Sequence, residues 1–327
     1  MIPCNPKVHV KSPLLAMTLG LTAFQSVAME FPADRTRTAV FTPDSGFLPP
    51  ADTTTLGLGY LYNDWHQLTD SHGDKLAPFK KIKAFSRGYM PALITMTDKQ
   101  LLGADYGFGV ALPIMHVRID NSIATPIGEM SMKGEDKGPF ALFLSPLILA
   151  WRDPTYTFTH NLQFNIDVPI NHLDGDNPAN VAQDYYATGV TWQFTWSPVP
   201  SYQIGSGLSY QYNFQNKHRQ HPTTSGPEGK YHNGDILVWN VGVGKQFGNW
   251  SLGLTSYWLQ QLRADRIDGA DDFDGPRARE FGFGPVLKYQ DLRSPHAPSL
   301  ALHYSHGVSS RDAVTGDYVT LIATWTL

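Results

Sequence analysis

The sequence predicts an all-β protein, a transmembrane antiparallel up-and-down β-barrel of about 12 strands. Three observations predict this fold. Strand-like runs alternate apolar and polar residues, the connections between runs alternate between short and long, and the last ten residues form an uncharged run, YVTLIATWTL. In that run Val319, Leu321, Ala323 and Trp325 share one face, because successive side chains of a strand point to opposite sides. A closing strand whose apolar face meets lipid explains such an end.

The chain of 327 residues begins with a pattern typical of a secretory signal. Lys7 and Lys11 precede an apolar run, residues 14–24, which is followed by small residues ending at Ala28. The apolar run is too short for a membrane-spanning helix, which needs about 20 residues. We predict three parts: a signal peptide over 1–28, an N-terminal periplasmic segment over 29–52 and an outer-membrane β-barrel over 53–327.

Charge and cysteine content exclude several classes of function. The chain has 25 basic and 29 acidic residues, and loss of Lys7 and Lys11 with the signal would leave 23 basic residues and a net charge of −6. Nucleic-acid binding is not expected, because it requires a basic face. The single cysteine, Cys4, lies in the predicted signal, so the mature chain would have no thiol nucleophile. No motif implies a cofactor, and we expect none.

The connections between the strand-like runs support a membrane barrel. The runs cover approximately 53–65, 82–97, 105–119, 140–152, 155–169, 184–197, 201–215, 235–248, 250–262, 279–290, 298–306 and 317–327. Connections after even-numbered runs are short. Those after odd-numbered runs are long and polar, over 66–81, 120–139, 170–183, 216–234, 263–278 and 307–316. Outer-membrane barrels combine short periplasmic turns with long extracellular loops. We therefore expect both termini on the periplasmic side and every long connection outside.

Side-chain alternation predicts which residues line the inside. The face opposite the large apolar residues is rich in amides, hydroxyls and glycine, with few charges. We predict that lumen-facing amides include Asn161, Gln163, Asn165, Gln193, Gln203, Gln211 and Asn240. A wall of neutral donors and acceptors should favour neutral or weakly polar solutes over ions. The opposite face contacts outer-membrane lipid, with Trp and Tyr near the strand ends, as in the aromatic girdles of membrane barrels.

The chain resembles the outer-membrane proteins associated with the meta-pathway of phenol degradation. The resemblance is carried by ALITMTDKQLLGADYGFGVALPI (92–114), LPPADTTTLGLGYLY (48–62), KYHNGDILVWNVGVGKQFG (230–248) and YWLQQLRADRIDG (257–269) followed by GFGP (282–285). It departs at Ala51, where family members tend to have glycine. The resemblance implies a barrel that admits hydrophobic aromatic compounds, with the catabolic chemistry done by other proteins.

These observations predict a passive outer-membrane channel, not an enzyme, for small hydrophobic, aromatic solutes linked to their catabolism. Gln261 and Asp265 match the Gln-x-x-x-Asp stretch of the family. With Tyr257 they are the candidates for a solute-contacting site where a strand meets an outer loop. An aromatic girdle residue with polar rim residues is an equally good explanation of the same three positions.

Two alternatives come from other functional classes. His303-Tyr304-Ser305 resembles the His-x-Ser arrangement of outer-membrane lipid hydrolases, in which the histidine activates the serine hydroxyl at a lipid-facing site. Here Leu302 and Tyr304 occupy the apolar face, so we expect His303 and Ser305 to face the lumen. The second alternative is a structural or surface-binding barrel that transports nothing.

Candidate metal and lipid sites lie in the predicted outer loops. Carboxylates could bind calcium at Asp265, Asp268, Asp271, Asp272 and Asp274, although the spacing is not that of an EF-hand loop. Imidazoles of His218, His221 and His232 could bind zinc or copper. A solvated loop explains both clusters better, and no metal is predicted. Lys80, Lys81 and Lys83 could contact anionic lipid headgroups.

Overall fold

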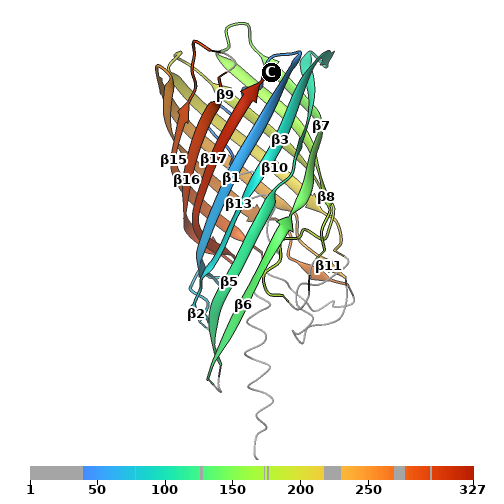
Figure 1. Ribbon diagram of the computed structural model, residues 1–327, viewed down its shortest axis with the longest axis vertical. Helices are drawn as coiled ribbons and strands as arrows, with labels where there is room; N and C mark the ends of the chain where they lie inside the picture. The colour runs from blue at the N-terminus through green and yellow to red at the C-terminus, as the bar shows by residue number, and fades with distance from the viewer. Residues whose placement is uncertain are drawn as a thin grey trace, which may run out of the picture.

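The computed structural model describes residues 40–327, apart from 78, 126–127, 173, 175–176, 217–229, 269–276 and 295–296. Twelve antiparallel strands form a closed barrel, because β1 pairs with both β17 and β3 (Figure 1). The barrel strands are β1 (Thr53–Leu68), β3 (Ala84–Leu101), β4 (Ala104–Ala111), β7 (Ala141–Arg152), β8 (Phe158–Pro169), β9 (Ala187–Trp196), β10 (Tyr202–Asn213), β12 (Ile236–Phe247), β13 (Trp250–Gln261), β15 (Arg279–Tyr289), β16 (Ser299–Arg311) and β17 (Val314–Thr326). The predicted fold class is confirmed. The predicted signal peptide lies outside the described residues.

Short connections gather at one end of the barrel, which we call the short-turn end. Only residues 102–103 separate β3 from β4, and only 248–249 separate β12 from β13. Leu102, Gly103 and Gly248 have positive φ angles of 54°, 73° and 58°, which a two-residue hairpin turn requires. The start of β1 and the end of β17 lie at this end as well, where the label C stands in Figure 1.

The outer face of the wall is apolar, as the alternation predicts. Trp192 and Leu208 are exposed on neighbouring strands, whereas Thr191 and Ser209, one residue along, are buried. Exposed aromatic side chains gather at the short-turn end: Trp196, Tyr202, Phe247 and Trp250. In water such side chains would be turned inward, but a barrel in lipid places them at the membrane interface. The uncharged last run of the chain is the strand that closes this wall.

One predicted outer loop is wrong. Residues 120–139 are not an irregular loop, because β5 (Ile114–Thr125) and β6 (Gly128–Pro139) form a long hairpin that extends beyond the barrel (Figure 1). Polar cross-strand contacts stabilise it, including an ion pair of Asp120 with Lys133 at 3.7 Å and a contact of His116 Nε2 with Glu135 Oε1 at 3.0 Å. A hairpin outside the membrane needs no lipid-facing apolar stripe, so the alternation pattern did not reveal it.

A second predicted loop, residues 307–316, is also wrong. Strand β16 continues to Arg311 and β17 begins at Val314, so only Asp312 and Ala313 connect them. Asp312 has a φ of 46°, a left-handed conformation that Asp tolerates better than most residues. The strand ends are polar because they continue past the apolar band, and their polarity makes them resemble a loop in sequence.

Three short strands complete the described elements. Strand β2 (Phe79–Lys81) pairs with β5, and β11 (Tyr231–His232) pairs with β14 (Arg266–Ile267). All three lie in the connections opposite the short turns, which we call the loop end. Within the described part of the chain, no helix is long and apolar enough to cross a membrane.

Candidate functional site inside the barrel

The lumen wall carries the amides that the sequence predicts. Asn161, Asn165, Gln211 and Asn240 are buried on the inner face, and Gln163, Gln193 and Gln203 are partly buried there. Many of these amides are held by neighbours on the wall. Asn165 donates to Thr191 Oγ1 at 3.1 Å, Gln163 donates to Asn161 Oδ1 at 3.0 Å and Gln211 donates to Asn213 Oδ1 at 2.8 Å. These amides therefore form a fixed neutral part of the inner wall.

A segment of the chain before the first strand occupies the lumen near the short-turn end. Residues 41–49, which we call the plug, lie inside the barrel, so this part of the segment predicted over 29–52 is not periplasmic. Residues 29–39 lie outside the described residues. Its Phe41 is 1% exposed and packs on Gly207 and Gly242 of the inner wall. Pro43 lies so close to Gly205 that an added Cβ there would stand 2.4 Å from the Pro43 carbonyl oxygen. Inward-facing glycines therefore make room for the plug.

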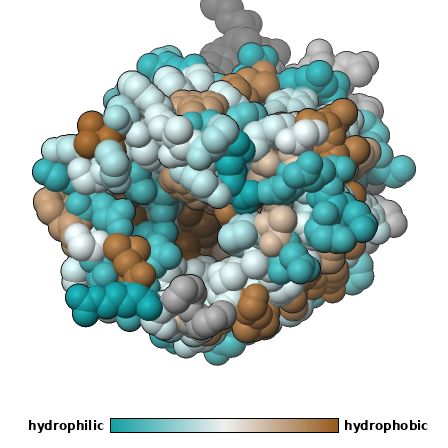
Figure 2. Space-filling view, turned by 90° about the horizontal axis from the view of Figure 1, so that it is seen from above, coloured by the Kyte–Doolittle hydropathy of each residue, from teal (hydrophilic) through white to brown (hydrophobic). Residues whose placement is uncertain are grey.

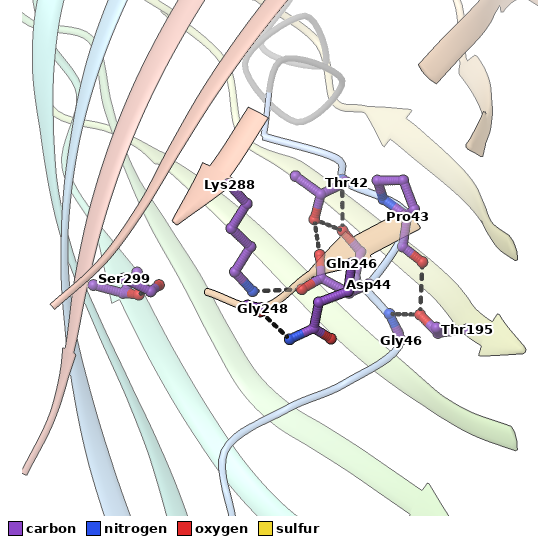
Figure 3. A network of polar contacts seen from close by, with 11 residues as sticks. Thr42, Pro43, Asp44, Gly46, Thr195, Gln246, Gly248, Lys288 and Ser299 are labelled. Carbon is purple, nitrogen blue, oxygen red and sulfur yellow. Dashed lines mark hydrogen bonds and ion pairs between the residues drawn. The ribbon is translucent and has the colours of Figure 1, made fainter. Parts of the chain in front are cut away.

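Neutral hydrogen bonds hold the middle of the plug to the wall (Figure 3). Thr195 Oγ1 donates to the carbonyl oxygen of Pro43 at 3.0 Å and accepts from the backbone N–H of Gly46 at 2.9 Å. Asn161 Nδ2 donates to the carbonyl oxygens of Ser45, at 3.0 Å, and Gly46, at 3.3 Å. One predicted lumen amide thus binds the backbone of the protein itself.

Two basic side chains of the wall also bind the plug. Lys288 of β15 forms an ion pair with Asp44, as Figure 3 shows. Arg152 of β7 forms an ion pair with Asp105 and donates to the carbonyl oxygen of Leu48 at 3.0 Å. The plug narrows the lumen without filling its whole section, since a hollow opens into the barrel when it is seen from the short-turn end (Figure 2).

Sequence reasoning missed the plug, but a signal for it was present. Strands β10 and β12 carry glycine repeatedly on the inner face, at Gly205, Gly207, Gly242 and Gly244. Glycine inside a strand weakens it and often marks a close approach of another backbone. Four such positions on two paired strands could have predicted that a chain segment lies against this part of the wall.

The loop end of the lumen is organised around a buried carboxylate. Glu280 Oε1 accepts hydrogen bonds from Tyr257 at 3.0 Å, Thr315 at 2.8 Å and Tyr318 at 2.7 Å. Tyr257, predicted as a solute-contacting residue, is therefore a partner of this carboxylate. Trp65 packs beside the two tyrosines. The cluster ties β13, β15 and β17 together.

Gln261 and Asp265, predicted beside Tyr257, have different partners. Both are fully buried, and Gln261 Nε2 donates to Asp265 Oδ1 at 2.5 Å. Asp265 also accepts from Tyr231 Oη at 2.5 Å and from the N–H of Gly234 at 2.9 Å. These contacts connect the loop after β10 to the loop after β13. The Gln-x-x-x-Asp stretch thus holds two outer connections together.

The histidine and serine of the hydrolase hypothesis face the lumen, as predicted. His303 and Ser305 are buried, and their outward neighbours Leu302 and Tyr304 are exposed. Ser305 Oγ lies 3.2 Å from His303 Nε2, and Thr255 Oγ1 lies 2.6 Å from the same nitrogen. The pair therefore has no contact with lipid, which a lipid hydrolase of this type requires.

The metal hypotheses gain no support from the described residues, among which no group of His, Cys, Asp and Glu is placed to hold a metal ion. His232 lies in β11, where burial and the charge of Arg266 lower its pKa. Asp268 accepts a hydrogen bond from Gln215. His218, His221, Asp271, Asp272 and Asp274 lie outside the described residues.

The lysines of the predicted headgroup site lie at the loop end. Lys80 and Lys81 belong to β2, and Lys83 follows it. Lys81 forms an exposed ion pair with Asp120 at 3.4 Å. Contact of these side chains with anionic headgroups stays a prediction.

Comparison with known families assigns the barrel to a family. Residues 56–321 match the model of the family described as "Putative MetA-pathway of phenol degradation". The chain belongs to this family. The match includes all or part of every barrel strand, so the resemblance noted in the sequence is confirmed. No curated protein matches the chain.

Solved structures agree with the fold. The structure is similar to that of an outer membrane channel from Pseudomonas putida F1, with a TM-score of 0.65 and 12% sequence identity, over 88% of this chain and 100% of that one. The β domain of the Bordetella autotransporter BrkA matches with a TM-score of 0.44, at 11% identity, over 84% and 99% of the two chains. A mutant of the monoaromatic hydrocarbon channel TodX matches at 0.41, with 11% identity, over 88% and 93%. The first match shows that the fold is that of an outer-membrane channel.

Proposed function

We propose that the protein is a passive channel of the outer membrane for small hydrophobic, aromatic compounds, delivered there by the signal peptide at 1–28. The observation that carries the proposal is a lumen walled by fixed neutral amides and narrowed by a segment of the chain itself. Charged solutes would find few groups to replace their hydration shell on such a wall, which favours uncharged ones. Membership in a phenol-degradation family supports aromatic solutes.

Passive passage is supported by the way the plug is held. The plug is short, and its contacts with the wall are the hydrogen bonds of Thr195, Asn161 and Arg152 and the ion pair of Asp44 with Lys288. Net contributions of about 1 kcal/mol for each hydrogen bond allow local release by thermal motion. We propose that the amides Gln163, Gln193, Gln203 and Asn240, together with Asn165 and Gln211, form the surface along which the solute moves. We propose a structural role for Gln261 and Asp265.

Uptake of a labelled neutral aromatic at limiting concentration tests the proposal. Cells with and without the gene would be compared, and the intact gene would be restored on a plasmid. We expect uptake to fall on deletion and to recover on restoration, with uptake of a labelled anion of similar size unchanged. Unchanged uptake of the aromatic, with the protein detected in the outer membrane of the restored strain, would refute the transport proposal.

A further inference from the structure

The ring of Phe41 rests on the bare backbone of two paired strands. Its Cε2 and Cδ2 atoms lie 3.3 and 3.4 Å from the point where Gly207 would carry a Cβ, and its Cε1 lies 3.3 Å from the equivalent point on Gly242. Gly205 of β10 pairs with Gly242 of β12, so the ring lies over this strand pair. Side chains at either glycine would meet the ring. The wall is therefore shaped to receive one flat ring.

Thr255, which has hydrogen-bonding partners, lies close to this ring. Thr255 Cγ2 is 3.1 Å from the Cβ point of Gly242, the same point that Phe41 approaches. The hydroxyl of Thr255 in turn lies 2.6 Å from His303 Nε2, which Ser305 also approaches. Thr255 Oγ1 also donates to the carbonyl oxygen of Gly284 at 3.3 Å, so it can accept from His303 Nε2 while Ser305 competes for the same nitrogen. A hydroxyl from a bound molecule could join this trio.

We propose that the space filled by Phe41 is an aromatic subsite of the lumen, and that a small single-ring phenolic solute takes the place of the Phe41 ring. The phenolic hydroxyl bonds within the trio of Thr255, His303 and Ser305. Without solute the ring of Phe41 fills this subsite, and the solute displaces the ring when it binds. This inference rests on the proposed channel function for its biological meaning, but binding can be measured without transport.

Line broadening in fluorine NMR of the purified full-length protein in detergent tests the subsite. The probes are 4-fluorophenol and fluorobenzene, which differ in the hydroxyl group. Phe41→Ala vacates the site, so we expect both probes to bind about tenfold more tightly than to the wild type. Phe41→Ala combined with Thr255→Val should keep the fluorobenzene affinity and lose several-fold of the preference for 4-fluorophenol.

Leu48→Ala is the matched control, because Leu48 belongs to the same plug but packs against Met96 and Ile148 instead of the glycines. It should leave both affinities unchanged. A gain as large as that of Phe41→Ala would show that any loosening of the plug exposes probe-binding surface, and it would overturn the subsite. Equal affinities of the wild type and Phe41→Ala would also overturn it. Phe41→Trp keeps the site filled and should show no gain.

The two proposals fail separately. Uptake that depends on the gene, with no gain in binding for Phe41→Ala, would leave the channel standing and remove the subsite. A clear gain in binding, with uptake independent of the gene, would keep the subsite and remove transport.

Discussion

The two ends of the lumen are filled in different ways. At the loop end, side chains of the barrel strands and of the outer connections fill the lumen. Glu280 of β15 bonds to side chains of β13 and β17, and Asp265 joins two outer connections. The connection between β8 and β9 packs on the β5–β6 hairpin at the same end, with Val181 in one apolar cluster with Val117 and Phe140. At the short-turn end the wall is lined by glycine and amides, and a separate segment, the plug, fills the space that they leave.

Because of this difference, we expect the loop end to determine the stability of the barrel and the short-turn end to determine whether the lumen is open. Contacts at the loop end connect strands to one another, so their loss should weaken the barrel. Contacts at the short-turn end connect the wall to a segment that carries no barrel strand, so their loss should open the lumen while the barrel stays folded. We therefore expect substitutions at the loop end to lower the stability of the barrel, and substitutions at the short-turn end to open the lumen at unchanged stability.

Glu280→Ala should give the largest effect on stability. It removes the acceptor of three buried hydroxyls, and leaving buried donors without a partner costs about 3 kcal/mol of unfolding free energy in total. Urea unfolding of the protein refolded in lipid vesicles measures the change. Glu129→Ala is the control, because Glu129 is an exposed carboxylate on β6, where surface substitutions change stability by less than about 0.5 kcal/mol. Equal losses for the two variants would contradict the organising role of Glu280.

Much of the barrel could be predicted because lipid imposes a simple rule on each strand. Residues such as Trp192, Phe164 and Leu208 must face outward when their neighbours Gln193, Asn165 and Ser209 face inward, and this alternation is visible in the sequence. The rule ends where the membrane ends. The hairpin of β5 and β6, and the junction of β16 with β17, lie beyond it, and there polar strands and polar loops have the same composition.

The candidate site was harder to predict because its partners are distant in sequence. Asn161 was correctly placed on the inner face, but nothing local indicates that it binds Ser45, 116 residues earlier. The same holds for Lys288 and Asp44. Family resemblance drew attention to Gln261 and Asp265, whose pattern is equally compatible with a solute site and with a structural link. Only the three-dimensional partners distinguish the two.

Asp44→Ala should open the lumen without weakening the barrel. Loss of the ion pair with Lys288 should raise the open fraction of single channels in planar bilayers about tenfold, which corresponds to about 1.4 kcal/mol. Exchange of the two charges, Asp44→Lys with Lys288→Asp, should restore most of the closed fraction. Lys245→Ala is the control, because Lys245 lies on the outer face at the same end, over the rings of Tyr202 and Phe247. An unchanged open fraction in Asp44→Ala would show that the ion pair does not hold the plug.

Thr195→Val should have the smallest effect of the three and tests whether neutral contacts contribute to closure. Valine keeps the shape of threonine but removes the hydroxyl that binds Pro43 and Gly46, so the plug loses about 1 kcal/mol and the open fraction rises about fivefold. Thr195→Ser keeps the hydroxyl and should stay near the wild type. If Thr195→Val instead lowered the urea midpoint and left the open fraction unchanged, the hydroxyl would stabilise β9 in the barrel wall and would not hold the plug. That result would contradict, at Thr195, the proposal that contacts at the short-turn end hold the plug without stabilising the barrel.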